Sequence, residues 1–141
     1  MTNDPVLNSM SRATIGAMAT TLAYLAAALV AAWGVAHAIP TRQVIAGFEP
    51  LSVDNRRVIA QEWLAEAFTM WGIAGIVIAM TAVAGAGADD SAWVYRVAAC
   101  LLVALAVLTG LTGARTPVVW FKICPVLLTG SALLLLIASF L

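Results

Sequence analysis

The chain of 141 residues is 63% hydrophobic and only 10% charged, with a mean hydropathy of +1.01. Soluble domains carry roughly 25% charged residues, so this composition excludes an ordinary soluble globular protein. Seven basic and seven acidic side chains give a formal net charge of zero, which offers no support for a nucleic-acid partner.

Four long apolar stretches dominate the sequence and predict a polytopic integral membrane protein. A helix rises about 1.5 Å per residue, so about 20 apolar residues cross a hydrocarbon core about 30 Å thick. The expected fold is all-α: a four-transmembrane-helix bundle that forms a single domain over residues 1–141, with a short interfacial helix between the first two spans. We expect the spans at about residues 15–39, 63–84, 92–111 and 117–141.

The first span ends at Pro40, which has no N–H group with which to continue a helix. Ala36-His37-Ala38 also resembles the small-x-small cleavage site of a secretory signal peptide. The apolar run, however, exceeds the core of about 7–15 residues that signal peptides have, so we interpret the segment as a true transmembrane helix.

The connection at residues 40–62 is the one long enough to hold structure of its own. A helix is expected over residues 55–62, with Arg56 and Arg57 on its polar face. Together with Arg42, these basic side chains are expected to face anionic lipid head groups. In the alternative interpretation, this helix is an extension of the second span and packs against neighbouring loops.

Polar residues before each later span predict where its helix begins. Asp54 is expected to cap the helix that leads into the second span, and either Asp90 or Ser91 the third. Proline is favoured at the first position of a helix, so the fourth is expected to begin at Pro117 with Thr116 as its cap.

Orientation follows from the basic residues, since the cytoplasmic side of a membrane protein is richer in Lys and Arg. One side of the predicted bundle carries two, Arg12 and Arg96. The other side carries five: Arg42, Arg56, Arg57, Arg115 and Lys122. The alanine-rich composition is common in bacteria of high GC content. We therefore expect a bacterial cytoplasmic membrane, with the connection 40–62 in the cytoplasm and both termini outside.

Two charged residues fall inside the predicted spans, where insertion of each costs about 2.5–3.5 kcal/mol. Glu66 and Lys122 lie at matching depths from the same membrane side, so we expect them to face the bundle interior and pair, directly or through water. His37, Glu62 and Arg115 fall at the same level. The five residues predict a polar cluster near the cytoplasmic face.

This cluster has two interpretations. A salt-bridge network would fix the order and depth of the helices, and we favour this structural role. Alternatively the cluster is a proton, ion or head-group site, since Glu62 and Glu66 share a helix face and imidazole titrates near neutral pH. No metal site is expected, because these carboxylates and His37 supply too few ligands. Cys100 and Cys124 form no Cys-x-x-Cys pair and are interpreted as packing residues.

Small residues recur at helical spacing in the first two spans. Such surfaces let helices approach closely in lipid, where no hydrophobic force drives their association. The predicted packing residues are Ala19, Ala23, Ala27, Ala31, Gly72 and Gly75, with Ala28, Ala32 and Ala36 on an adjoining ridge. Because the first span carries small residues on more than one face, we expect it to be central in the bundle or to dock against another subunit.

The leading functional hypothesis is a non-enzymatic small subunit, or an assembly or scaffold factor, of a larger membrane complex. Its expected partners are the lipid bilayer and other membrane subunits or further copies of itself. A small oligomeric channel or transporter is the alternative, with Glu66, Lys122 and His37 along the pathway. A lipid- or quinone-modifying enzyme is a third, weaker hypothesis. No cofactor is expected, although the sequence leaves room for a bound lipid, quinone or pigment.

Overall fold

The computed structural model describes residues 5–141, and every regular element in this range is a helix. Four helices are long and apolar enough to cross a membrane, which confirms the all-helical class and the expected number of long apolar helices. The elements are α1 (Pro5–Ala38), α2 (Thr41–Ala46), α3 (Val53–Ala84), α4 (Asp89–Leu111), the 3-10 turn η1 (Gly113–Arg115) and α5 (Val119–Ala138).

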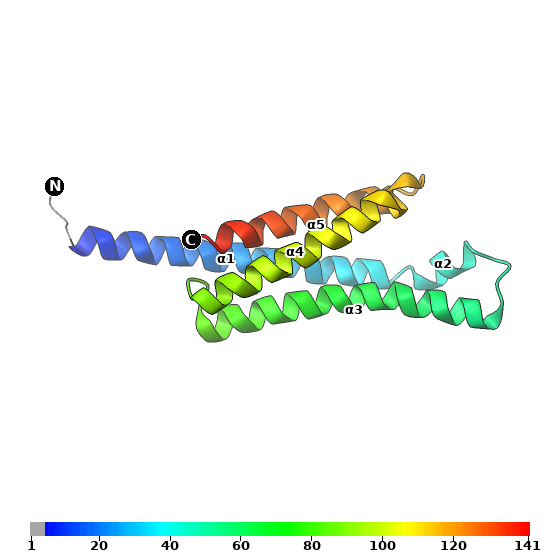
Figure 1. Ribbon diagram of the computed structural model, residues 1–141, viewed down its shortest axis with the longest axis horizontal. Helices are drawn as coiled ribbons and strands as arrows, with labels where there is room; N and C mark the ends of the chain where they lie inside the picture. The colour runs from blue at the N-terminus through cyan, green and yellow to red at the C-terminus, as the bar shows by residue number, and fades with distance from the viewer. Residues whose placement is uncertain (1–4) are drawn as a thin grey trace.

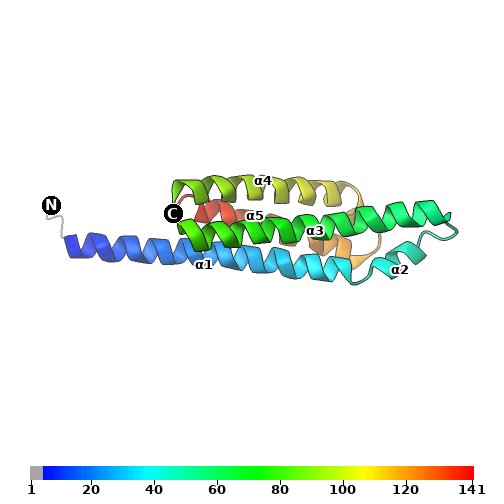
Figure 2. The same ribbon diagram turned by 90° about the horizontal axis from the view of Figure 1, so that it is seen from below.

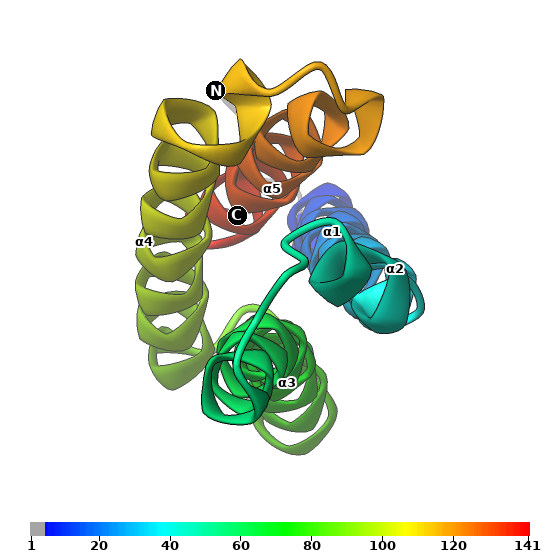
Figure 3. The same cartoon turned by 90° about the vertical axis from the view of Figure 1, so that its right-hand side faces the viewer.

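The four long helices form a four-sided bundle. Helix α1 packs on α3 and α5, and α4 packs on α5 and α3. The α4–α5 pair is inclined to the α1–α3 pair (Figure 1), and the end view in Figure 3 shows the four helices around a common axis. Each long helix thus has two principal neighbours. The first helix is therefore not central, and the alternative, that it docks against another subunit, stays a prediction.

The two longest helices extend beyond the others at opposite ends of the molecule (Figure 2). Helix α1 begins about ten residues earlier than expected, and its 34 residues span about 51 Å, well beyond a hydrocarbon core of about 30 Å. Its first turns carry exposed Val6, Leu7 and Met10. At the other end, α2 and the start of α3 extend past the turn that joins α4 to α5.

Helix α3 resolves the two interpretations of the segment 55–62. This segment is the first part of a continuous 32-residue helix, and the separate short helix of the connection is α2 instead. Ser52 caps α3, because its Oγ accepts a hydrogen bond from the Asn55 N–H at 3.1 Å. The prediction of Asp54 as the cap is wrong, since Asp54 already lies in the first helical turn while Ser52 is extended.

The turn between α3 and α4 depends on Gly85, whose φ of +82° is readily adopted only by glycine. Ser91 was expected to cap α4, but its hydroxyl donates back to the Gly85 carbonyl oxygen at 2.7 Å. The N-cap of α4 is Ala88, which makes no side-chain capping bond, so the predicted caps at Asp90 and Ser91 are wrong.

Helix α5 begins two residues later than expected. Its N-cap is Val118, and Pro117 precedes the helix. The Thr116 hydroxyl donates to the Gly113 carbonyl oxygen at 2.7 Å, which closes the η1 turn, and accepts from the Val118 N–H at 3.4 Å. Thr116 is nevertheless not the N-cap of α5, because that position is Val118. The helix then ends at Ala138, with Pro125 inside it.

Candidate functional site

The candidate site lies where the last turn of α1 meets α3, and we call it the histidine–glutamate site (His37, Trp63 and Glu66). The rings of His37 and Trp63 stack, with centroids 4.0 Å apart and planes 14° from parallel. The Trp63 indole N–H also donates to the backbone carbonyl oxygen of His37 at 2.8 Å. This double contact fixes the imidazole against α3 with only 8% of its side chain exposed.

The imidazole faces a carboxylate. Nε2 of His37 lies 3.5 Å from Oε2 of Glu66, whose side chain is 28% exposed. Nε2 makes no hydrogen bond, so it is a buried polar atom with an unused donor or acceptor capacity. The two groups form an ion pair when the imidazole is protonated.

Aromatic contacts connect this site to α5 and η1. The ring of Trp63 meets that of Phe121 edge to face, with centroids 5.8 Å apart. Phe121 in turn covers Gly113, where a Cβ atom would lie 3.3 Å from the ring. The apolar rings therefore separate the His37 imidazole from the turn between α4 and α5.

Two further tryptophans hold the same half of α1. The Trp71 indole N–H donates to the Ala31 carbonyl oxygen at 3.2 Å, which joins α3 to α1. The Trp33 indole N–H lies 3.1 Å from the sulfur of Cys124, a buried free thiol on α5. Indole groups in this region thus satisfy their N–H donors between helices.

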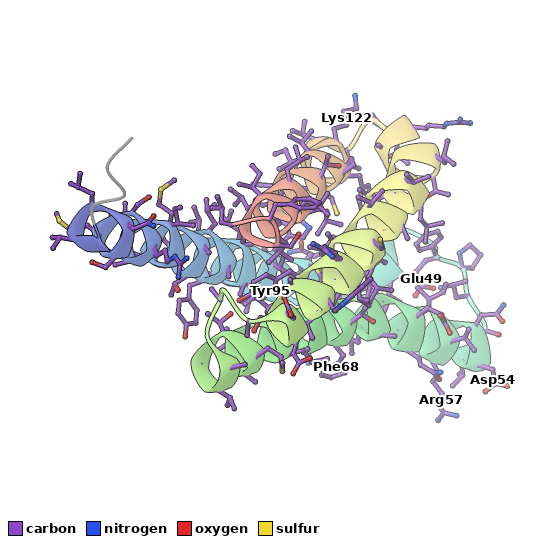
Figure 4. All side chains as sticks on the ribbon, turned by 60° about the vertical axis from the view of Figure 1, so that its left-hand side comes forward. Glu49, Asp54, Arg57, Phe68, Tyr95 and Lys122 are labelled. Atoms are coloured by element: carbon purple, nitrogen blue, oxygen red, sulfur yellow. The ribbon has the colours of Figure 1, made fainter. Side chains whose placement is uncertain are left out.

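The predicted five-residue cluster is only partly assembled. His37 and Glu66 come together, whereas Lys122, Glu62 and Arg115 are exposed and take part in none of the ion pairs among residues 5–141. The prediction that Glu66 pairs with Lys122 is wrong. Figure 4 shows the Lys122 side chain pointing away from the bundle. The reason is helical rotation: two residues turn a helix by about 200°, so Lys122 lies opposite buried Cys124.

The predicted interfacial arginines lie at the α2 end of the bundle. Arg56 pairs with Glu49, and Arg57 lies 3.7 Å from Asp54, both in exposed positions. Figure 4 shows Arg57 and Asp54 at the far end of α3. Arg42 on α2 is exposed and belongs to none of the ion pairs that the structure describes. Two of the three charges are therefore already matched by acidic neighbours.

The small residues divide into buried and exposed sets. Ala19, Ala23 and Ala27 are at most 2% exposed and pack inside the bundle, and Ala31 is half-buried. Two further sets face outward. We call them the outer α1 face (Ala28, Ala32 and Ala36) and the outer α3 face (Gly72, Gly75 and Ala79).

Sequence reasoning missed several polar and glycine contacts between helices. The Tyr95 hydroxyl lies 2.6 Å from that of Thr81 in the buried core, where Figure 4 shows Tyr95 between the helices. Arg96 binds Ser139 at the opposite end of the bundle from the histidine–glutamate site. Gly34 lies against the Trp71 indole. The hydroxyl residues within the membrane-length helices were the available signal, because a hydroxyl buried there needs a hydrogen-bond partner.

No protein-family model matches the chain, and neither the curated proteins nor the solved structures give a match. Within residues 5–141 no group of three or more His, Cys, Asp or Glu side chains is placed to hold a metal ion.

Proposed function

We propose that the protein is a non-enzymatic integral membrane subunit, or an assembly or scaffold factor of a larger membrane complex, that acts through helix packing. The observation that carries this proposal is the exposure of the outer α1 face and the outer α3 face after the four long helices have packed. Both faces lie on helices that are long and apolar enough to span a membrane.

Space over the outer α3 face supports close approach of another helix. A Cβ atom built on Gly72 or Gly75 would meet no atom within 4 Å. Helices in lipid associate through such small residues, because close backbone approach supplies van der Waals contacts that lipid tails supply less well. The inner alanines of α1 are already used within the bundle, so the outer faces remain for another membrane subunit or a further copy of this chain.

The surroundings of the histidine–glutamate site favour a structural role over a pathway. Two cavities, of about 240 and 340 Å³, lie along α4, and neither is lined by His37 or Glu66. A conduction or transport pathway requires polar side chains along a water-filled space. The stacked Trp63 ring and the edge-on Phe121 ring give the imidazole apolar neighbours instead.

A small oligomeric channel or transporter is the second candidate. The observation in its favour is the buried Nε2 atom of His37, which faces Glu66 without a hydrogen bond. An unpartnered imidazole nitrogen beside a carboxylate is suited to accept and release a proton. In this proposal the remainder of the pathway would form between copies of the chain.

The proposed setting is the cytoplasmic membrane of a bacterium, with the α2 end of the bundle in the cytoplasm. Five of the seven basic residues belong to this end, and cytoplasmic loops carry such an excess. Helix α2 and the first turns of α3 would then lie at the level of the head groups. Both termini would lie outside, a proposal that for the N-terminus concerns residues 1–4, outside the described residues.

The test is native mass spectrometry of the protein extracted gently from its own membrane, with each co-purifying chain recorded. Ala28→Leu and Gly75→Leu fill the two outer faces, so we expect each to lose partner chains that the unchanged protein retains. Ala104→Leu is the matched control, since Ala104 is an exposed small residue on α4 outside both faces. Ala27→Leu is unsuitable, because Ala27 is 2% exposed and its replacement would disturb the bundle itself.

Two results would contradict the proposal. In the first, both filling variants keep every partner chain that the control keeps. In the second, the protein is recovered without partners, and Glu66→Gln removes a proton flux measured in vesicles. The second result would establish the channel or transporter instead.

A further inference from the structure

A polar cavity of about 340 Å³ lies at the end of the bundle opposite the histidine–glutamate site. The turn between α3 and α4, the first turns of α4 and the end of α5 line it. Its charged and hydroxyl side chains are Arg96, Asp89 and Ser139. The proposed scaffold function makes no use of these groups.

Arg96 is held in place with part of its hydrogen-bonding capacity unused. Its Nε donates to the Ser139 hydroxyl at 3.3 Å and its Nη2 to the Ser139 carbonyl oxygen at 3.1 Å. The guanidinium carbon lies 5.3 Å from the Trp93 ring centroid and 4.9 Å from that of Phe140. A guanidinium has five N–H groups, and none of the ion pairs among residues 5–141 includes Arg96. Its charge is therefore rigidly placed and unmatched by a carboxylate.

An apolar groove of about 240 Å³ lies on the neighbouring side of α4, between α4 and α3. Trp93 lines both this groove and the polar cavity. From Trp93 the groove continues along α4 past Val97 to Leu101, away from the polar end of the bundle. The two spaces therefore meet at one indole ring, with a cation on one side and an apolar path on the other.

We infer that this surface binds a phospholipid with an amine-containing head group. The phosphate lies on the Arg96 guanidinium, the ammonium group faces Asp89, and one acyl chain follows the α3–α4 groove. Guanidinium groups bind phosphate through charge-assisted hydrogen bonds. A phosphate without an amine would meet the Asp89 carboxylate as a like charge, which is why the assignment is to a zwitterionic lipid whose ammonium group carries N–H donors.

The exposed aromatic residues fit this assignment. Trp93 and Phe140 are 64% and 76% exposed and flank the arginine. Tryptophan is enriched at the level of lipid head groups, where its ring is apolar and its N–H is hydrated. The inference does not depend on the scaffold function, since it concerns α4 and the end of α5 rather than the outer faces of α1 and α3.

The test measures lipid binding to the full chain in detergent by native mass spectrometry, with phosphatidylethanolamine, phosphatidylglycerol and phosphatidylcholine added singly. We expect phosphatidylethanolamine to bind at least about tenfold more tightly than the other two, because its ammonium group is a charged hydrogen-bond donor to the carboxylate, whereas choline has no N–H and the glycerol head group offers only neutral hydroxyls. Arg96→Gln should weaken its binding by about tenfold or more, the loss expected for one charge-assisted hydrogen bond. Arg12→Gln, at an exposed basic residue on α1, should leave binding within about twofold.

A second pair of variants tests the groove without touching Arg96. Leu101→Trp fills the acyl path and should weaken binding on the order of tenfold, as loss of one or two buried methylene groups does. Leu108→Trp is its control, since Leu108 is an exposed leucine two turns further along α4 and outside the groove. Both proteins should keep the circular dichroism spectrum of the unchanged chain.

The inference is overturned if phosphatidylglycerol binds as tightly as phosphatidylethanolamine, or if Arg96→Gln and Arg12→Gln have equal effects. It is also overturned if Leu101→Trp and Leu108→Trp bind equally. A lipid and a free phosphate ester could offer the same head-group chemistry, and soluble glycerophosphoethanolamine distinguishes them. If this competitor displaces the lipid completely at millimolar concentration, the site binds a free phosphate ester rather than a lipid.

Discussion

At the scale of single residues, the close contact of α1 with α3 depends on Gly34. A Cβ atom at this position would lie 2.6 Å from Nε1 of Trp71 and 3.3 Å from the Ala67 carbonyl oxygen. The indole cannot move away freely, because its N–H donates to the Ala31 carbonyl oxygen. We therefore expect Gly34→Ala to lower the free energy of unfolding by about 1–3 kcal/mol, the usual cost of overpacking.

Reversible unfolding in mixed detergent micelles, followed by tryptophan fluorescence, measures this change. Gly130→Ala is the matched control, because a Cβ atom there meets nothing within 4 Å and alanine has the higher helix propensity. The control should equal or exceed the unchanged protein in stability. Equal stability of the two variants would show that α1 and α3 do not approach as closely as described.

The partner of Glu66 can be tested by double-mutant cycles. The structure places His37 Nε2 3.5 Å from the Glu66 carboxylate, whereas Lys122 is exposed and points away. Residues in contact couple by about 0.5 kcal/mol or more, and independent sites add within about 0.3–0.5 kcal/mol. We expect the cycle of Glu66→Gln with His37→Gln to show such coupling in unfolding measurements, and the cycle with Lys122→Gln to show none. A larger coupling of Glu66 with Lys122 than with His37 would instead support the Glu66–Lys122 pair that the sequence predicted.

The sequence predicted His37 and Glu66 within one polar cluster, but it paired Glu66 with Lys122 of the fourth span instead of with His37. Depth along a helix follows from counting residues, which is why His37, Glu66 and Lys122 were expected at one level. Whether a side chain points inward depends on how each helix is rotated in the bundle, and that rotation is decided by packing. Burial of Cys124 turns Lys122 outward, and no charge pattern in the sequence shows this.

At the scale of elements, α3 and α4 are joined by the buried hydroxyl pair of Thr81 and Tyr95. The Thr81 hydroxyl has one proton, and it donates this to the Val77 carbonyl oxygen at 2.7 Å. The Tyr95 hydroxyl must therefore be the donor to Thr81. The pair is asymmetric, since only the tyrosine loses its partner when the other residue is removed.

This asymmetry predicts unequal costs of substitution. Tyr95→Phe removes one hydrogen bond and should cost about 0.5–1.5 kcal/mol, because Thr81 keeps its bond to Val77. Thr81→Val leaves the Tyr95 hydroxyl buried without an acceptor and should cost more, about 1–3 kcal/mol. The same unfolding assay compares the two variants. An equal or reversed order would contradict the assignment of Tyr95 as the donor.

The helices themselves were predictable, whereas their ends were less so. Hydropathy identified all four membrane-length helices because about 20 apolar residues leave few alternatives. Hydropathy could not show that α1 begins about ten residues before its apolar segment, since helix propensity extends past that segment. For α3, the helix over residues 55–62 was expected, but its continuity with the second span was only one of two interpretations. The predicted cap of α3 was wrong for a related reason. Ser52 and Asp54 are both good capping residues, and only the backbone conformation decides between them.

At the scale of the whole molecule, the two ends differ in charge and in form. The α2 end carries the exposed ion pairs of Arg56 and Arg57 together with Arg42, Arg115 and Lys122. The opposite end carries the short turn between α3 and α4, the cavity of Arg96 and the projecting start of α1. A bilayer with anionic lipids on one side would distinguish these ends, because polybasic segments gain on the order of 1 kcal/mol per Lys or Arg at such a surface.

This difference predicts one orientation, which single cysteines can report in intact cells. Gly87→Cys lies in the α3–α4 turn and Phe48→Cys in the connection after α2, at opposite ends of the bundle (Figure 2). Cys100 and Cys124 are first replaced by alanine to remove background. A maleimide that cannot cross the membrane should label Gly87→Cys in intact cells, and Phe48→Cys only after the cells are opened. Replacing Arg42, Arg56 and Arg57 by glutamine should produce a mixed population, because the excess of basic residues at the α2 end falls from three to zero. If Phe48→Cys is labelled in intact cells while Gly87→Cys is protected, the basic end faces outward and the proposed orientation is reversed.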